Sequence, residues 1–84
     1  MNILLTGGTG YIGSHTAVDL VEVGHKIVLF DNLSNSSRDV VGRLERITNQ
    51  SIPFVEGDIR DTLLLSKTIR ERKVDAVIHF AGFK

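Results

Sequence analysis

Strand-like and helix-like patterns alternate along the whole chain, and this alternation is the strongest constraint on its fold. Two short apolar runs occupy residues 2–6 and 26–30, and two further strand-like segments occupy residues 51–56, where Pro53 would fit the first position of a strand, and 75–80. Short runs with few polar residues are typical of strands that are buried on both faces of a sheet. Apolar residues at helical spacing occupy the segments between these runs. Such alternation predicts an α/β fold, in which helices connect the strands of a parallel sheet.

The connections also limit the order of the strands. Right-handed crossovers predict a parallel sheet of order 3-2-1-4 with crossover helices, which is a partial Rossmann fold. The length of 84 residues lies below the roughly 100–150 residues of a typical domain. We therefore expect residues 1–84 to be the N-terminal part of a larger dinucleotide-binding domain, truncated before its remaining strands and without a substrate domain.

Capping residues and one-sided apolar spacing predict the three helices. Gly24 lies where a left-handed C-cap is expected after the first helix. Ser36 and Asp39 resemble a capping box before the second helix, and Asp61 or Thr62 is placed to cap the third. The apolar positions are Ile12, Ala17, Leu20 and Val21 in the first helix, Val40, Val41, Leu44 and Ile47 in the second, and Leu64, Leu65 and Ile69 in the third.

Charge balance and the lack of cysteine argue against several functions. Ten basic and ten acidic residues leave no net charge, so a nucleic-acid partner held by phosphate neutralisation is not expected. Without cysteine there is no disulfide, thiolate zinc site or thiol catalysis, which fits a cytoplasmic protein. No apolar run approaches the roughly 18 residues of a membrane span, so no membrane partner is expected. The histidines lack metal-ligand spacing, so no metal site is expected either.

Three glycines form the motif that carries most of the chemical information. Gly7, Gly10 and Gly13 are spaced G-x-x-G-x-x-G, directly after the first strand and at the start of the first helix. Glycine permits positive φ in the turn and lets a pyrophosphate approach the backbone. The N–H groups and dipole at a helix N-terminus favour phosphate there. The motif predicts a dinucleotide site, and the alternative is a glycine-rich turn that binds nothing.

Asp31 ends the second strand, about twenty residues beyond the glycine motif. A carboxylate at this place can accept hydrogen bonds from both ribose hydroxyls of an adenosine and would repel a 2′-phosphate. No basic residue follows until Arg38, so we expect NAD rather than NADP. The alternative is a solvated turn aspartate. The small polar residues after it are suited to line the ribose and phosphates, or form a turn; they lie in the segment 32–36.

Other candidate residues carry weaker signals. Asp58 follows the third strand, where it could accept from the adenine amine, and Ile59 could cover the adenine ring. Spacing alone favours the simpler interpretation, in which Asp58 forms an Asx turn before a helix. His79 lies inside the fourth strand and is predicted to be a hydrogen-bonded core histidine rather than a catalyst. Tyr11, the only tyrosine, lies in the glycine motif, where its backbone N–H is the useful group.

Together these segments resemble the extended short-chain dehydrogenase/reductase family. The segments that carry the resemblance are 6–15 (TGGTGYIGSH), 31–33 (DNL), 57–61 (GDIRD) and 77–82 (VIHFAG). Segments 31–36 (DNLSNS) and 79–84 (HFAGFK) are most similar to the sugar-nucleotide epimerases of that family. Sugar dehydratases of the family usually carry a different segment after the fourth strand.

The resemblance implies a tightly bound NAD and a substrate that is a UDP-sugar. In this family branch, hydride leaves C4 of the sugar for NAD and returns to the other face, which interconverts UDP-glucose and UDP-galactose. The resemblance also implies a homodimeric full-length enzyme. The resemblance adds further cofactor residues to those that the glycine motif and Asp31 already predict. The full set is Gly7, Gly10, Tyr11, Ile12, Gly13, Asp31, Asn32, Leu33, Ser34, Asn35, Ser36, Asp58, Ile59, Phe80, Ala81, Gly82, Phe83 and Lys84.

One departure from the family pattern bears on activity. The family's general base is a tyrosine followed four residues later by a lysine, whereas Tyr11 is followed by His15. We therefore assign no catalytic residue within residues 1–84 and expect this chain alone to have no epimerase activity. A stand-alone NAD-binding sensor module, another sugar-nucleotide dehydrogenase or dehydratase, and a scaffold that binds nothing remain alternatives.

Two apolar features predict association or marginal stability. The fourth strand would form an exposed sheet edge over residues 76–80, and such edges tend to pair with other chains. Leu63, Leu64 and Leu65 are consecutive, so no single helix face can bury all three.

Overall fold

The structure is a computed structural model that describes residues 1–7, 11–32 and 39–80. Strands and helices alternate along these segments. Their bounds are β1 (Asn2–Thr6), α1 (Tyr11–Glu22), β2 (Lys26–Asp31), α2 (Asp39–Thr48), β3 (Phe54–Glu56), α3 (Thr62–Glu71) and β4 (Ala76–His79).

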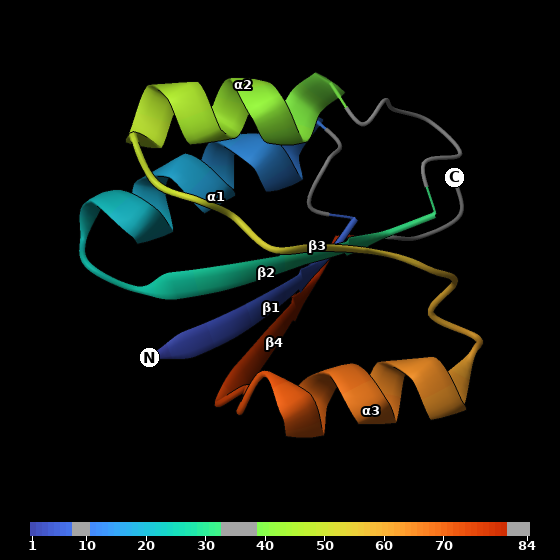
Figure 1. Ribbon diagram of the computed structural model, residues 1–84. Coiled ribbons are helices and arrows are strands. Elements are labelled where there is room, and N and C mark those ends of the chain that lie inside the picture. Colours follow the sequence, from blue (N-terminus) through green and yellow to red (C-terminus); the bar gives the residue numbers. More distant parts are fainter. Residues whose placement is uncertain (8–10, 33–38, 81–84) are drawn as a thin grey trace.

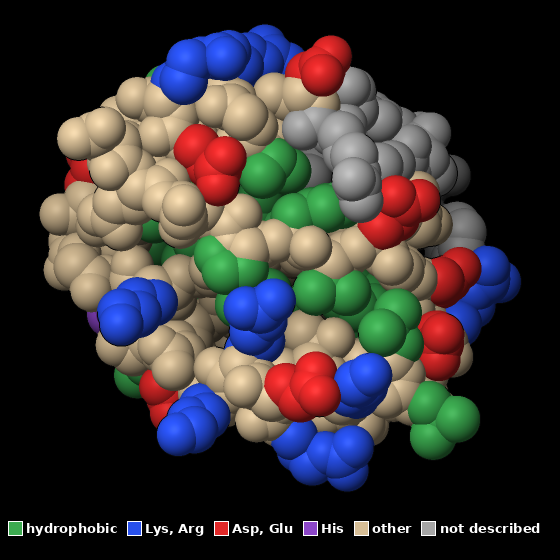
Figure 2. Space-filling model, viewed as in Figure 1, with side chains coloured by type: hydrophobic (Ala, Val, Ile, Leu, Met, Phe, Trp, Pro, Cys, Tyr) green, Lys and Arg blue, Asp and Glu red, His purple; other side chains and the backbone are tan. Residues whose placement is uncertain are grey.

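The strands form one parallel sheet that is covered on both faces. Its order is β3-β2-β1-β4, which confirms the predicted α/β fold and its 3-2-1-4 sheet. Helices α1 and α2 lie on one face and α3 lies on the other (Figure 1). On the side that presents β3, hydrophobic side chains gather between the charged side chains over α2 and α3 (Figure 2).

Side chains of the central strands alternate between two hydrophobic clusters. Ile3 and Leu5 of β1 belong to the cluster under α1 and α2, whereas Leu4 belongs to the cluster under α3. The same alternation holds in β2, where Leu29 and Phe30 are fully buried in opposite clusters. Burial on both faces explains why β1 and β2 are continuous apolar runs.

Helices α1 and α2 pack as predicted except at two positions. Gly24 ends α1 with a φ of 99°, and the N–H of His25 donates to the carbonyl oxygen of Leu20 at 3.0 Å, as expected of a glycine C-cap. Ile12 and Ile47, both predicted to face the core, are 64% exposed. Each lies in a terminal turn of its helix, where the described part of the sheet does not cover it.

Helix α3 confirms both the predicted cap and the predicted face. The Asp61 side chain accepts a hydrogen bond from the N–H of Leu64 at 3.1 Å, so Asp61 rather than Thr62 is the N-cap. Leu64, Leu65 and Ile69 pack against the cluster beneath. Leu63 is 83% exposed, as expected where three consecutive leucines meet one helix face. The predicted contact of Ser36 with Asp39 lies outside the described residues.

Strand β3 is shorter than the sequence indicates, because a proline interrupts its ladder. The predicted strand segment begins at residue 51, but pairing with β2 begins at Phe54. The Pro53 carbonyl accepts from the N–H of Leu29 at 2.9 Å. In this register the N–H of residue 53 would bond to the Ile27 carbonyl, and proline has no N–H. Strand β4 is likewise shorter than the predicted run 75–80 by one residue at each end.

Candidate cofactor-binding site

The carboxyl ends of the four parallel strands lie at one end of the sheet, and the predicted cofactor residues lie at or just after those strand ends. Gly7 follows β1 with a φ of 72°, and its N–H donates to the Phe30 carbonyl of β2 at 2.8 Å. This is the positive φ that the strand-to-helix turn was expected to require of a glycine. Gly10 lies outside the described residues.

Helix α1 begins at Tyr11, close behind the turn. Its first turn carries the backbone N–H groups of Tyr11 and Ile12 and contains no acidic residue that would repel a phosphate. Gly13 is buried in the same turn. In motifs of this kind, the third glycine permits close packing of the helix against the strand.

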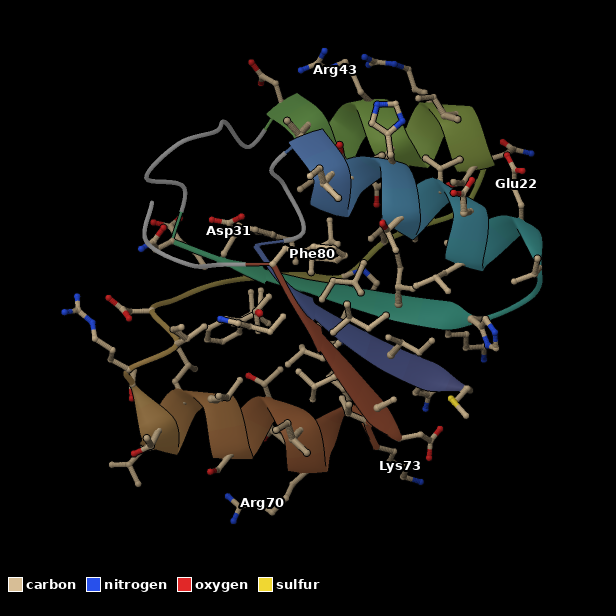
Figure 3. All side chains as sticks on the ribbon, turned by 180° about the vertical axis from the view of Figure 1, so that it is seen from behind. Glu22, Asp31, Arg43, Arg70, Lys73 and Phe80 are labelled. Atoms are coloured by element: carbon tan, nitrogen blue, oxygen red, sulfur yellow. The ribbon has the colours of Figure 1, made fainter. Side chains whose placement is uncertain are left out.

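Asp31 is the last residue of β2 and is partly buried. Its carbonyl oxygen accepts from the N–H of Gly57 at 3.0 Å, which ties the ends of β2 and β3 together. Asp31 and Phe80 lie at the same end of the sheet (Figure 3). Asn32 is exposed just beyond Asp31. The next predicted residues, Leu33, Ser34, Asn35 and Ser36, lie outside the described residues.

Phe80 follows β4 and is anchored to β1. Its N–H donates to the Thr6 carbonyl at 2.7 Å, and its side chain packs against the hydrophobic cluster under α1 and α2. The other predicted residues of this segment, Ala81, Gly82, Phe83 and Lys84, lie outside the described residues.

Asp58 lies in the loop after β3, where its carboxylate forms an Asx turn with Arg60. Oδ1 accepts from the Arg60 backbone N–H at 2.8 Å, and Oδ2 accepts from the guanidinium, also at 2.8 Å. These hydrogen bonds, above all those from the guanidinium, lower the pKa of Asp58 to about 2. The carboxylate is therefore ionised at neutral pH. Ile59 packs against the cluster under α3.

Two structural features at this end of the sheet were not foreseen from the sequence. Thr6 Oγ1 lies 2.5 Å from Nδ1 of His79, and the two residues are partners in the β1–β4 register. His79 is exposed, so the prediction of a core histidine is wrong, although the ring has a hydrogen-bond partner. Gly57 packs so tightly between Leu64 and Phe30 that a Cβ would lie 2.5 Å from Leu64 Cδ2. The predicted pairing of the first and fourth strands is the only signal in the sequence for the contact of Thr6 with His79. The sequence carries no signal for the close packing at Gly57.

Other possible sites are few among the described residues. A cavity of about 280 Å³ lies at the opposite, amino-terminal end of the strands, so it is separate from the predicted cofactor site. It is lined by Asn2, Val21, His25, Lys26, Ile27, Val28, Gln50, Ser51, Ile52, Pro53 and Arg72. Within the described ranges, no group of three metal-binding side chains could hold an ion. No helix in that part of the chain is long and apolar enough to cross a membrane.

The sheet order, the glycine turn and the aspartate at the end of β2 define a Rossmann-type nucleotide-binding fold. Comparison with known proteins gives the family: residues 4–84 match the family described as GDP-mannose 4,6 dehydratase, and the chain belongs to it.

Known relatives are similar to this sequence along nearly its whole length. A UDP-glucose 4-epimerase of Neisseria meningitidis serogroup A is 57% identical over 83 residues, which are 99% of this chain and 24% of the relative. The crystal structure of a Stenotrophomonas maltophila UDP-glucose 4-epimerase, with bound NAD and formylated UDP-arabinopyranose, matches with a TM-score of 0.98 and 49% identity, over 100% of this chain and 25% of that one.

A related enzyme with another activity is also similar. The structure of a Bacillus anthracis dTDP-glucose 4,6-dehydratase in complex with NAD has a TM-score of 0.86 and 34% identity, covering 99% of this chain and 27% of that one. The present chain thus spans about a quarter of the length of each of these three proteins.

Proposed function

We propose that this chain is the NAD-binding portion of a UDP-glucose 4-epimerase. The observation that carries the proposal is a glycine turn at the end of β1 beside an aspartate at the end of β2, in a chain 57% identical to such an epimerase. The Stenotrophomonas maltophila relative holds both NAD and a UDP-sugar, which supports the cofactor and the substrate class.

The described residues fit the pyrophosphate and ribose of NAD. Gly7 leaves no side chain between the end of β1 and a bound phosphate, and the first-turn N–H groups of Tyr11 and Ile12 are the donors for it. Gly10 and Gly13 complete the motif. Asp31 accepts from the ribose hydroxyls and, because of its charge, disfavours the 2′-phosphate of NADP.

The remaining roles concern the adenosine and the groove. Asp58 is ionised and accepts from the adenine amine, while Ile59 covers the ring. Asn32, Leu33, Ser34, Asn35 and Ser36 line the adenosine side. Phe80 and the segment after it, Ala81, Gly82, Phe83 and Lys84, line the cofactor groove.

The proposed reaction interconverts UDP-glucose and UDP-galactose. Bound NAD supplies reversible hydride transfer at C4 of the sugar. This chain contributes by orienting the cofactor, since its only tyrosine, Tyr11, lacks a lysine four residues later. We expect residues 1–84 alone to be inactive and the full-length enzyme to be a cytoplasmic homodimer.

A sugar-nucleotide 4,6-dehydratase is the second candidate. The family description and the Bacillus anthracis structure favour it. The identity to that structure is 34%, against 49% and 57% for the two epimerases, which supports the epimerase. The segment 79–84 also resembles the epimerases.

Thermal unfolding of the 84-residue chain with NAD and with NADP tests the cofactor proposal. At a hundredfold excess over Kd, NAD is expected to stabilise the folded state by about 2.7 kcal/mol, a shift of roughly 10 °C or more in Tm. NADP is expected to shift Tm far less, because its 2′-phosphate would face Asp31.

An Asp31→Asn variant should lose most of the NAD-dependent shift. Asp19→Asn, an exposed change on α1, should keep it. A cooperative transition that neither nucleotide moves would overturn the cofactor proposal, and equal shifts with NAD and NADP would overturn the role of Asp31.

A further inference from the structure

Thr6 and His79 join β1 and β4 by a side-chain hydrogen bond. The Thr6 side chain points to the α3 face, because Leu4 two residues earlier packs in the cluster on that face. Thr6 is 2% exposed, and Phe30, its partner in β2, belongs to the same cluster. A buried hydroxyl among apolar side chains requires a hydrogen-bond partner, and Nδ1 of His79 at 2.5 Å supplies it.

The hydrogen bond lies where the strand order reverses. Strands β2 and β3 are added one after the other on one side of β1, whereas β4 pairs with β1 on its other side. In open parallel sheets, ligands bind beside the carboxyl ends of the strands at this reversal. Thr6 and His79 are the last residues of the two strands that flank it.

Each of the two residues directly precedes a segment proposed to hold the cofactor. Gly7 follows Thr6, and Phe80 follows His79. Backbone hydrogen bonds continue the link, because the N–H of Phe80 donates to the Thr6 carbonyl at 2.7 Å. The side-chain bond is therefore positioned to set the separation of the two segments.

We propose that Thr6 and His79 are a positioning pair that holds Gly7 and Phe80, the first residues of the two proposed binding segments, at the separation required by the dinucleotide. The inference rests on the proposed function for its ligand. Neither residue is assigned contact with the cofactor. Their hydrogen bond acts by preorganising the binding segments, which lowers the entropy lost on binding.

Hydrogen exchange of backbone amides in the 84-residue chain tests the pair without any ligand. Thr6→Val removes the hydroxyl and keeps the shape of the side chain. It should speed exchange at Gly7 and Phe80 about three- to tenfold relative to the amides of Leu4 and Val28, as expected for one lost hydrogen bond.

Thr68→Val is the matched control. Thr68 is also buried, at 5% exposed, and its hydroxyl donates to the Leu64 carbonyl at 2.9 Å, away from the β1–β4 junction. Thr68→Val should not speed hydrogen exchange at the amides of Gly7 and Phe80 more than at other amides. If both variants alter exchange in the same pattern, the positioning role is wrong. If Thr6→Val does not fold, His79→Leu gives the same test at an exposed position.

The Kd for NAD supplies the second readout. Thr6→Val and His79→Leu should weaken binding about three- to tenfold, whereas Thr6→Ser and His79→Asn, which retain a hydrogen-bonding group, should recover most of it. Unchanged affinity in all variants would contradict the inference. If the unaltered chain binds no NAD, the proposed function fails, and the exchange experiment still decides whether the pair positions the two segments.

Discussion

At the scale of one residue, Asp58 forms a turn of the fold and is also a residue of the proposed binding site. Arg60 donates to it from the backbone N–H and from the guanidinium. A carboxylate can accept about four hydrogen bonds, and Arg60 already supplies four contacts, so a donor from a nucleotide would take the place of a guanidinium contact and leave the contact of the Asx turn in place. The Asx turn and the proposed adenine contact are therefore compatible.

The pKa of Asp58 is the measurable consequence of this turn. A carboxyl-detected NMR titration of the folded chain should give a midpoint of about 2, against the ordinary value of 3.8. Arg60→Ala should raise that midpoint, though not fully to 3.8, because the backbone N–H of residue 60 remains. Arg43→Ala on α2, on the outer side of the molecule in Figure 3, should leave it unchanged.

The sign of the effect on stability follows from the same shift. The folded-state pKa of Asp58 is lower than its unfolded value, so its contribution to the free energy of unfolding is present above a pH of about 4. That contribution is lost as the pH falls toward the folded-state pKa of about 2. A midpoint near 3.8 in the unaltered chain would show that Arg60 does not hold the carboxylate in solution.

At the scale of elements, Gly57 sets how closely α3 approaches the sheet. A Cβ at this position would lie 2.5 Å from Leu64 Cδ2 and 2.9 Å from Phe30 Cζ. Both atoms belong to the packed interface of α3 with β2. The requirement for glycine is one of space, since the positive φ values among the described glycines are at Gly7 and Gly24.

Gly57→Ala should therefore destabilise the chain by about 1–3 kcal/mol, the usual cost of overpacking. Urea unfolding followed by circular dichroism measures the change. Gly42→Ala is the control, because nothing lies within 4 Å of a Cβ added there, inside α2. That control should be stabilised by about 0.5–1 kcal/mol, since glycine disfavours a helix interior. Stabilisation of both variants would refute the packing argument.

At the scale of the whole molecule, the described sheet has two edges, β3 and β4. β4 pairs with β1 along one side only, and Val77 in its middle is 49% exposed. A strand edge with unpaired backbone groups and exposed apolar side chains favours pairing with another strand. The neutral net charge of the chain opposes such pairing little.

We expect the 84-residue chain to self-associate as its concentration rises, which sedimentation velocity measures. Val77→Lys should reduce the association, because lysine on an edge strand disfavours pairing. Val23→Lys changes a residue that is 72% exposed but lies outside the strands, and should not reduce it. A monomer at every concentration of the unaltered chain would contradict the expectation.

The sequence by itself determined the elements and their order in the sheet, together with the C-cap at Gly24 and an N-cap at Asp61 or Thr62. Periodicity and capping are properties of neighbouring residues, so the alternation of patterns, Gly24 and Asp61 were sufficient for this. Local patterns were less reliable for exposure. Ile12 and Ile47 have helical spacing but lie beyond the cover of the sheet, and Pro53 shortens the strand that the sequence pattern predicts.

The tertiary structure alone decided which distant residues meet. Thr6 and His79 are 73 residues apart in the chain and become partners because β4 returns beside β1. Gly57 appears in the sequence as an ordinary loop residue, and only the packing of Leu64 and Phe30 against it leaves no space for a Cβ. Contacts of this kind depend on how whole elements pack against each other, and no pattern of neighbouring residues records that packing.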